Sequence, residues 1–144
     1  MQLKYILLSF ALLTGFAAGA QGFGAPVGSN AKLPEPSQDT NGVYNFVQHR
    51  PMFGNGYNDV KAYLAAHVHY PDSAKALRIQ GKVFIKFVVN EDGSLSDFKM
   101  IRGVSKELDD EAMRVIKEMP KWKPGMQNGK TVKVYFTVPV EFYL

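Results

Sequence analysis

The chain has 144 residues, enough for one ordinary domain, and its hydrophobic fraction of 46% and charged fraction of 21% are typical of a globular protein rather than a disordered one. The formal net charge is +4, and without Lys4, the single charge in the first twenty residues, it is 16 minus 13, or +3. Acidic and basic residues alternate, which argues against nucleic-acid binding, and the absence of cysteine excludes disulfides, thiol catalysis, cysteine-ligated metal and a lipid-attachment cysteine.

The first twenty residues have the pattern of a secretory signal peptide. Lys4 precedes an uncharged apolar run over residues 5–18, and Ala18-Gly19-Ala20 is a small-x-small cleavage pattern. We expect a mature chain beginning near Gln21, located in the periplasm if the source is a bacterium. The alternative is an uncleaved inner-membrane anchor, but the run is shorter than the about 20 apolar residues of a spanning helix.

Residues 21–41 are rich in glycine and proline and lack an apolar period, so we expect a flexible linker there and a folded domain over residues 42–144. Within the domain, Asn58 or Asp59 can cap a helix to about His67, with an apolar stripe at i, i+3 and i+4. A second short helix is expected over residues 72–77, opened by Pro71 in its first turn.

Two strands and a long helix follow. Alternating apolar residues predict a strand from Gly81, and Asp92-Gly93 predicts a tight turn into a return strand over residues 94–102. Leu95 is out of phase with Phe98 and Met100, which indicates a bulge near Ser96-Asp97. Ser105 can cap a helix to Met119, whose apolar positions are Leu108, Ala112, Val115, Ile116 and Met119.

The last strand is predicted over residues 131–143, after a turn at residues 127–130, because apolar and polar side chains alternate without a break. A tight turn makes the first two strands antiparallel, and the helix returns the chain so that the last strand lies beside the first. The predicted fold is a two-layer α+β domain, with a three-stranded antiparallel sheet of order 3-1-2 and helices on one face. The last strand is then an edge, which agrees with Pro139 because proline has no N–H to donate.

We find no pattern of catalysis or of cofactor or metal binding. His67 and His69, two residues apart, do not converge on a helix and are interpreted as surface residues. Asp109, Asp110 and Glu111 lie in the first turn of a predicted helix, where the helix dipole explains them. The chain is therefore not expected to be an enzyme.

Several motifs resemble those of the TonB C-terminal domain family and follow one another in the order found in that family. The segment before them, residues 46–56, resembles the Bacteroidetes-type members. The motifs are Tyr70-Pro71 with Ala74, Gly81-Lys82-Val83, Asn90-Glu91-Asp92-Gly93, Leu108-Asp109-Asp110-Glu111-Ala112, Met119-Pro120-Lys121-Trp122-Lys123-Pro124-Gly125, Asn128-Gly129-Lys130 and Val138-Pro139-Val140-Glu141-Phe142.

The resemblance implies a module that binds the TonB box, a short extended segment of an outer-membrane TonB-dependent receptor, by strand addition at the last strand and so supports energy-dependent transport. The expected binding edge lies ahead of the proline and comprises Thr131, Val132, Lys133, Val134, Tyr135, Phe136, Thr137 and Val138. Candidates for flanking contacts are Lys121, Trp122, Lys123 and Tyr143, although a lone tryptophan is more often a core residue.

The resemblance also implies a proton-driven inner-membrane motor, reached directly or through a separate anchored partner. Residues 21–41 are much shorter than the proline-rich spacer of a full TonB. The resemblance therefore supports a binding role for this chain better than it supports a role in force transmission. The alternative function is a periplasmic structural adaptor that binds envelope partners, or a second copy of itself in a weak homodimer, through the same edge.

Overall fold

A computed structural model describes residues 35–144. The predicted signal peptide and most of the predicted linker lie outside these residues. Within residues 35–144, none of the helices has the length and apolar character needed to cross a membrane.

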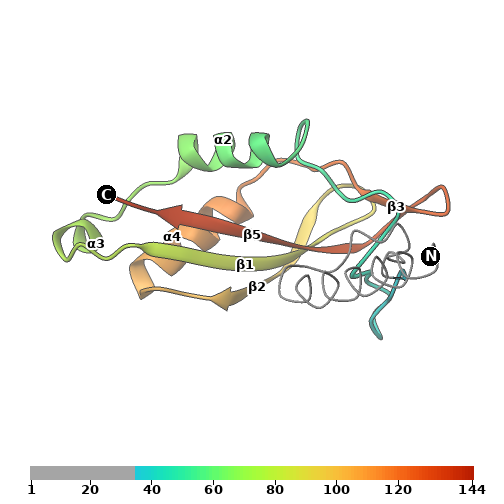
Figure 1. Cartoon of the computed structure of the whole chain (residues 1–144), viewed down its shortest axis with the longest axis horizontal. Coiled ribbons are helices and arrows are strands. Elements are labelled where there is room, and N and C mark those ends of the chain that lie inside the picture. Colours follow the sequence, from blue (N-terminus) through green and yellow to red (C-terminus); the bar gives the residue numbers. More distant parts are fainter. Residues whose placement is uncertain (1–34) are drawn as a thin grey trace, which may run out of the picture. The chain divides into compact units, whose positions relative to one another are not determined.

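The core of the domain is a three-stranded antiparallel sheet in the order β2-β1-β5, as Figure 1 shows. Its strands are β1 (Gly81–Val89), β2 (Leu95–Arg102) and β5 (Val134–Phe142). The tight turn between β1 and β2 is closed by a hydrogen bond from the Asn90 N–H to the Ser94 carbonyl (2.8 Å). Gly93 adopts a φ of 85° in this turn, a conformation that favours glycine. The predicted α+β class and strand order are confirmed.

β2 contains the predicted bulge. Opposite β1, the partners of Val88 and Lys86 are Ser96 and Lys99, so one extra residue of β2 lies between these pairs. Asp97 has a φ of 50° at this point. The bulge returns the side chains to one face, and both Leu95 and Phe98 therefore pack against the core.

One face of the sheet is covered by α4 (Lys106–Lys117), which lies behind the strands in Figure 1. Ser105 caps this helix as predicted, its side chain accepting a hydrogen bond from the Leu108 N–H (3.4 Å). The predicted apolar face is buried in full: Leu108, Ala112, Val115, Ile116 and Met119 join Val83, Ile85, Phe87, Val138, Val140 and Phe142 in the core.

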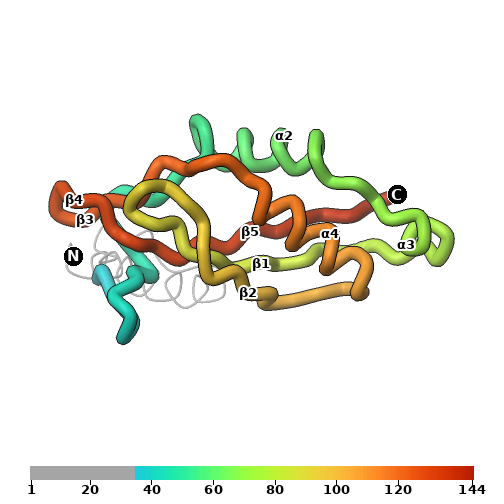
Figure 2. The backbone as a smooth tube through the Cα atoms, turned by 180° about the vertical axis from the view of Figure 1, so that it is seen from behind, coloured from blue at the N-terminus to red at the C-terminus, as the bar shows by residue number. Residues whose placement is uncertain are grey.

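Within residues 35–144, two further helices precede the sheet, α2 (Tyr57–His67) and α3 (Asp72–Ala76). α2 lies along the β5 side of the sheet in both backbone views (Figures 1 and 2). The predicted cap at Asn58 or Asp59 is wrong: the N-cap is Gly56, and the Asp59 carboxylate accepts the Asn55 N–H (2.8 Å) in the preceding turn. Pro71 is likewise the N-cap of α3 rather than its first residue.

Glu111 of α4 connects the helical layer to the end of α2. Its carboxylate accepts the His69 N–H at 2.7 Å and two hydrogen bonds from Arg114, at 2.7 and 2.9 Å. Arg114 also donates to the His67 carbonyl at 3.1 Å. The pKa of Glu111 is held below its ordinary value chiefly by Arg114, against the opposing effect of partial burial. These bonds fix the C-terminal end of α2 against α4.

A small hairpin stands apart from the main sheet. It consists of β3 (Gly125–Gln127) and β4 (Lys130–Val132), joined by a turn in which Asn128 and Gly129 have φ values of 51° and 75°. The chain before α2 runs alongside, since His49 and Met126 exchange backbone hydrogen bonds of 3.1 and 2.9 Å. The turn was predicted at residues 127–130, but the strand before it was not.

Candidate peptide-binding edge

The outer edge of β5 is the open edge that the sequence predicts, because β5 has β1 as its one neighbour in the sheet. The two strands pair over nine consecutive positions without a register shift. The Tyr135 N–H points away from β1, since it donates to the Tyr44 carbonyl at 2.9 Å. By the two-residue period of a strand, the N–H groups of Thr137 and Glu141 also point outward.

Pro139 occupies one of these outward positions, opposite Phe84 of β1. An N–H group at residue 139 would face away from β1, so its absence removes no hydrogen bond of the β1–β5 ladder. This explains how a proline is tolerated in the middle of a long strand.

The predicted single strand over residues 131–143 is wrong, because it breaks at Lys133. Thr131 and Val132 belong to β4 and pair with Met126 and Gly125 of β3. The Asn128-Gly129 turn folds residues 130–132 back onto residues 125–127, which removes these two candidate residues from the edge of the main sheet.

The next part of the predicted site, at Lys133, Val134 and Tyr135, is already paired by the chain itself. The Tyr44 N–H donates to the Lys133 carbonyl (2.8 Å), and Tyr44 lies parallel to Val134 in an isolated bridge. Of the eight predicted edge residues, Phe136, Thr137 and Val138 remain. Thr137 is the exposed one, whereas Val138 is fully buried in the core and Phe136 packs against it.

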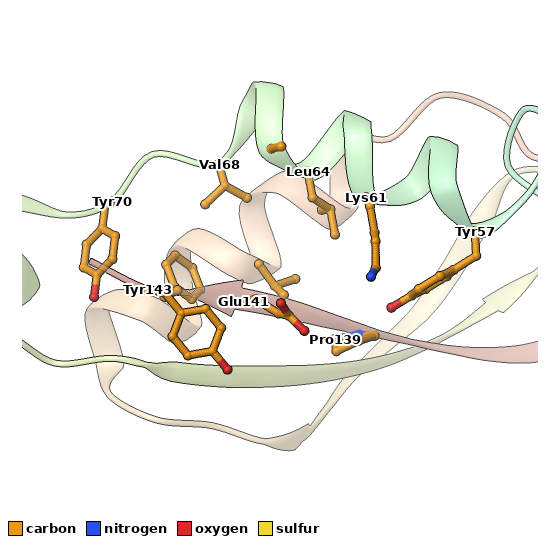
Figure 3. Close-up of a pocket in the computed structure, with 11 residues that line it drawn as sticks. Tyr57, Lys61, Leu64, Val68, Tyr70, Pro139, Glu141 and Tyr143 are labelled. Atoms are coloured by element: carbon orange, nitrogen blue, oxygen red, sulfur yellow. The ribbon is translucent and has the colours of Figure 1, made fainter.

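Beyond Thr137 the edge faces a groove of about 390 Å³ that lies between α2 and the end of β5. Figure 3 shows the side chains of Tyr57, Lys61 and Leu64 projecting from α2 toward β5. The groove is lined by Tyr57, Lys61, Leu64, Ala65, Val68, Tyr70, Pro139, Val140, Glu141, Phe142 and Tyr143. This groove is not among the sequence-based predictions, although Tyr57, Lys61, Leu64 and Val68 form a stripe at helical spacing that could have indicated it.

The charges around the groove are unequal. Glu141 forms a cross-strand ion pair with Lys82 of β1 at 2.8 Å, and this contact lowers the pKa of Glu141 and raises that of Lys82. Lys61 lies over the Tyr57 ring, with 5.4 Å from its Nζ to the ring centroid. In residues 35–144 no carboxylate forms an ion pair with Lys61. Lys61 is therefore a cation that the groove offers to a bound molecule, and its charge also contributes to lowering the pKa of Glu141.

The four predicted flanking residues have different surroundings. Trp122 is 4% exposed and packs against Phe136 and Phe87, with ring centroids 4.9 and 5.4 Å away. It is a core residue, so its predicted role as a flanking contact is wrong. Lys121 and Lys123 are exposed on the crossover before β3, and Tyr143 lines the groove. The two histidines, His67 and His69, are exposed at the end of α2.

Together these features define a small α+β binding domain that presents an open strand edge beside an apolar groove. Residues 66–144 match the family model described as the C-terminal domain of the Gram-negative bacterial TonB protein. The match covers more than half of the chain, and the chain belongs to this family. TonB-family proteins are binding and energy-transduction proteins rather than enzymes, and this chain is accordingly not an enzyme.

Two curated relatives are both named Protein TonB. The protein from Haemophilus influenzae is 31% identical over 96 residues, which cover 59% of this chain and 36% of the relative. The protein from Pasteurella multocida is 28% identical over 123 residues, which cover 78% of this chain and 48% of the relative. The chain thus matches half or less of the length of these relatives.

Two solved structures are also similar, both NMR solution structures of Helicobacter pylori TonB-CTD. Their sequence identities to this chain are 23% and 22%, and their TM-scores are 0.47 and 0.48. The matches cover 59% and 62% of this chain and 89% and 85% of the solved chains.

Proposed function

We propose that this protein captures the TonB box of an outer-membrane TonB-dependent receptor in the periplasm, by adding it as a strand to the open edge of β5. The observation that carries the proposal is the edge itself: from Thr137 onward, its outward backbone groups have no partner strand within residues 35–144. In strand addition, main-chain hydrogen bonds supply affinity and pockets for side chains supply selectivity. Such binding would support energy-dependent transport across the outer membrane, with force supplied by an inner-membrane motor or by a separate anchored partner.

The groove supports this function because it lies where the side chains of an added strand would extend. Leu64 and Val68 offer apolar surface to one guest side chain, and Lys61 offers a cation to an acidic one. One added strand buries less than the ~1,200 Å² of a standard stable interface, so we expect weak, reversible binding. Weak binding suits a contact that is made and released repeatedly.

Titration of the isotope-labelled protein with TonB-box peptides, followed by NMR, tests the proposal. We expect the largest shift changes at Thr137 and Glu141 of β5 and at Lys61 of α2. A scrambled peptide of the same composition is the control. Changes confined to β2 or to the β3–β4 hairpin would overturn strand addition at β5.

The alternative adaptor function uses the same edge, which a second copy of the chain can also approach. Sedimentation of the protein without peptide separates the two functions. A mass that rises with concentration, together with no response to the peptides, would favour self-association.

A further inference from the structure

Residues 38–44, here called the guard segment, cover the beginning of the β5 edge. They take two outward backbone groups there: the Lys133 carbonyl accepts from the Tyr44 N–H (2.8 Å), and the Tyr135 N–H donates to the Tyr44 carbonyl (2.9 Å). A guest strand needs the same two groups to pair with this part of β5. The guard segment and a long guest therefore exclude one another.

One side-chain hydrogen bond ties the guard segment to the strand. The Tyr135 hydroxyl donates to the Asp39 carboxylate at 2.6 Å. This hydroxyl is also the main cause of the lowered pKa of Asp39. The other oxygen of the carboxylate accepts the N–H groups of Asn41 and Val43, both at 2.9 Å, which closes the segment into a compact loop.

The attachment of the guard segment is small compared with that of a full strand. Val43 is its buried anchor, 4% exposed, and Tyr44 is the one residue bridged to β5. After Tyr44 the chain leaves the edge and pairs with β3 through His49 and Met126. Coverage therefore ends at Tyr135, and the edge is open from Thr137.

We propose that the guard segment determines which length and starting position of guest strand the β5 edge accepts. A short extended peptide pairs between Thr137 and Tyr143 while the guard segment stays in place. A longer peptide that reaches Lys133 binds by displacing the guard segment, and its affinity is reduced by the free energy that holds the segment on β5. The inference rests on the proposed capture of a peptide at this edge and adds a length preference to it.

The test is a calorimetric titration of the full chain with two TonB-box peptides of one receptor: a long one that can span residues 133–143 and its truncation that can span residues 137–143. Tyr135→Phe removes the hydroxyl that binds Asp39 but keeps the ring under Lys86, whose Nζ lies 3.8 Å from the ring centroid. Asp39→Ala removes the same bond from the other side, together with the two bonds that the carboxylate accepts from the Asn41 and Val43 N–H groups. Lys86→Gln is the matched control, since it alters the same ring contact without touching the guard segment.

We expect Tyr135→Phe to bind the long peptide about three- to tenfold more tightly, the range that one lost hydrogen bond allows, and Asp39→Ala, which loses more bonds of the guard segment, to bind it at least as tightly. The short peptide should bind all proteins equally. In NMR, the long peptide is expected to shift the amide signals of Val43 and Tyr44 strongly and the short one weakly. Equal changes in affinity for both peptides, or no change in affinity for the long peptide, would overturn the proposed role of the guard segment. Neither result would contradict the capture of a peptide at the β5 edge. If neither peptide binds any of the proteins, peptide capture fails and the length preference fails with it.

Discussion

Along the β1–β5 ladder, nine residue pairs follow one another without a shift, whereas the ladder between β1 and β2, at the opposite edge of the same sheet, has two irregularities. The β2 edge carries a bulge at Asp97 and exposed charges at Lys99 and Arg102. Bulges and edge charges are features that prevent a strand from pairing with another chain. The β5 edge has a regular backbone, and α2 flanks its second half. The same sheet thus protects one of its edges and leaves the other available for a partner.

The largest effect, on the free energy of unfolding, is expected from removing the bulge that protects the β2 edge. Deleting Asp97 should abolish the bulge and slip the strand by one residue, which moves either Leu95 or the pair Phe98 and Met100 off the core face. The loss of this packing should lower the free energy of unfolding by about 3 kcal/mol or more, measured by denaturant titration. Asp97→Gly, which suits the positive φ, is the control and should change stability by less than about 1 kcal/mol. A deletion variant as stable as the wild type would show that the bulge does not set the register.

The next largest effect concerns the open edge. Thr137→Pro removes an outward N–H that is not used within the sheet, so a guest carbonyl opposite it loses its partner. We expect TonB-box peptides to bind at least about fivefold more weakly, because an unpaired carbonyl costs about 1–3 kcal/mol, while the far-ultraviolet circular dichroism stays unchanged. Thr137→Val keeps the N–H and should bind like the wild type. Equal affinities for the proline and valine variants would count against strand addition at this position.

A smaller effect is expected from the contacts that hold the α2 side of the groove. Glu111→Gln weakens the bonds to Arg114 and His69, and we expect it to lower the free energy of unfolding by about 1–2 kcal/mol at neutral pH. Because the folded pKa of Glu111 is depressed, its stabilisation is complete above the ordinary glutamate pKa of about 4.3 and is lost as the pH falls through the lower folded value. Denaturation of both proteins between neutral and acidic pH should show the difference shrinking as the solution becomes acidic. A difference that is constant with pH would exclude the carboxylate as its cause.

The smallest effect is expected at Glu141, whose ion pair with Lys82 is exposed to solvent on both sides. Exposed pairs contribute little to stability, so Glu141→Gln should leave the denaturation midpoint unchanged within the precision of the measurement. Peptide affinity should also be unchanged if backbone groups carry the binding. A strong loss of affinity would show that the charge of Glu141, and not the backbone groups of β5 alone, contributes to peptide binding.

Local patterns predicted most of the fold because each element buries a face with a regular period. The apolar stripe from Leu108 to Met119, the β1–β2 turn and the bulge near Asp97 all depend on neighbours in the sequence, and all were found. The exclusion of Thr131 and Val132 from the sheet was not predicted. Apolar alternation continues across Lys133 even though the strand does not, and only pairing with β3 shows the break.

The candidate site was predictable in part for a related reason. The order of the elements and Pro139 predicted which strand forms the edge. The order of the elements determines the sheet topology, and a proline in a strand is typical of an edge. Coverage by Tyr44 and the groove beside Lys61 depend on contacts between segments far apart in the chain, and residues 38–41 had been assigned to the linker. The open stretch of the edge is therefore residues 137–143 and not the predicted residues 131–138.

Pro139 has a consequence for symmetry. A single guest strand paired across this part of β5 lacks one hydrogen bond, at the position where the proline has no N–H to donate. Two copies of β5 paired about a two-fold axis lack two, because each copy brings its own proline to the shared ladder. The same residue thus penalises a symmetric pair of identical strands twice as heavily as it penalises a foreign strand. In this way a single side-chain ring makes the edge discriminate against its own copy.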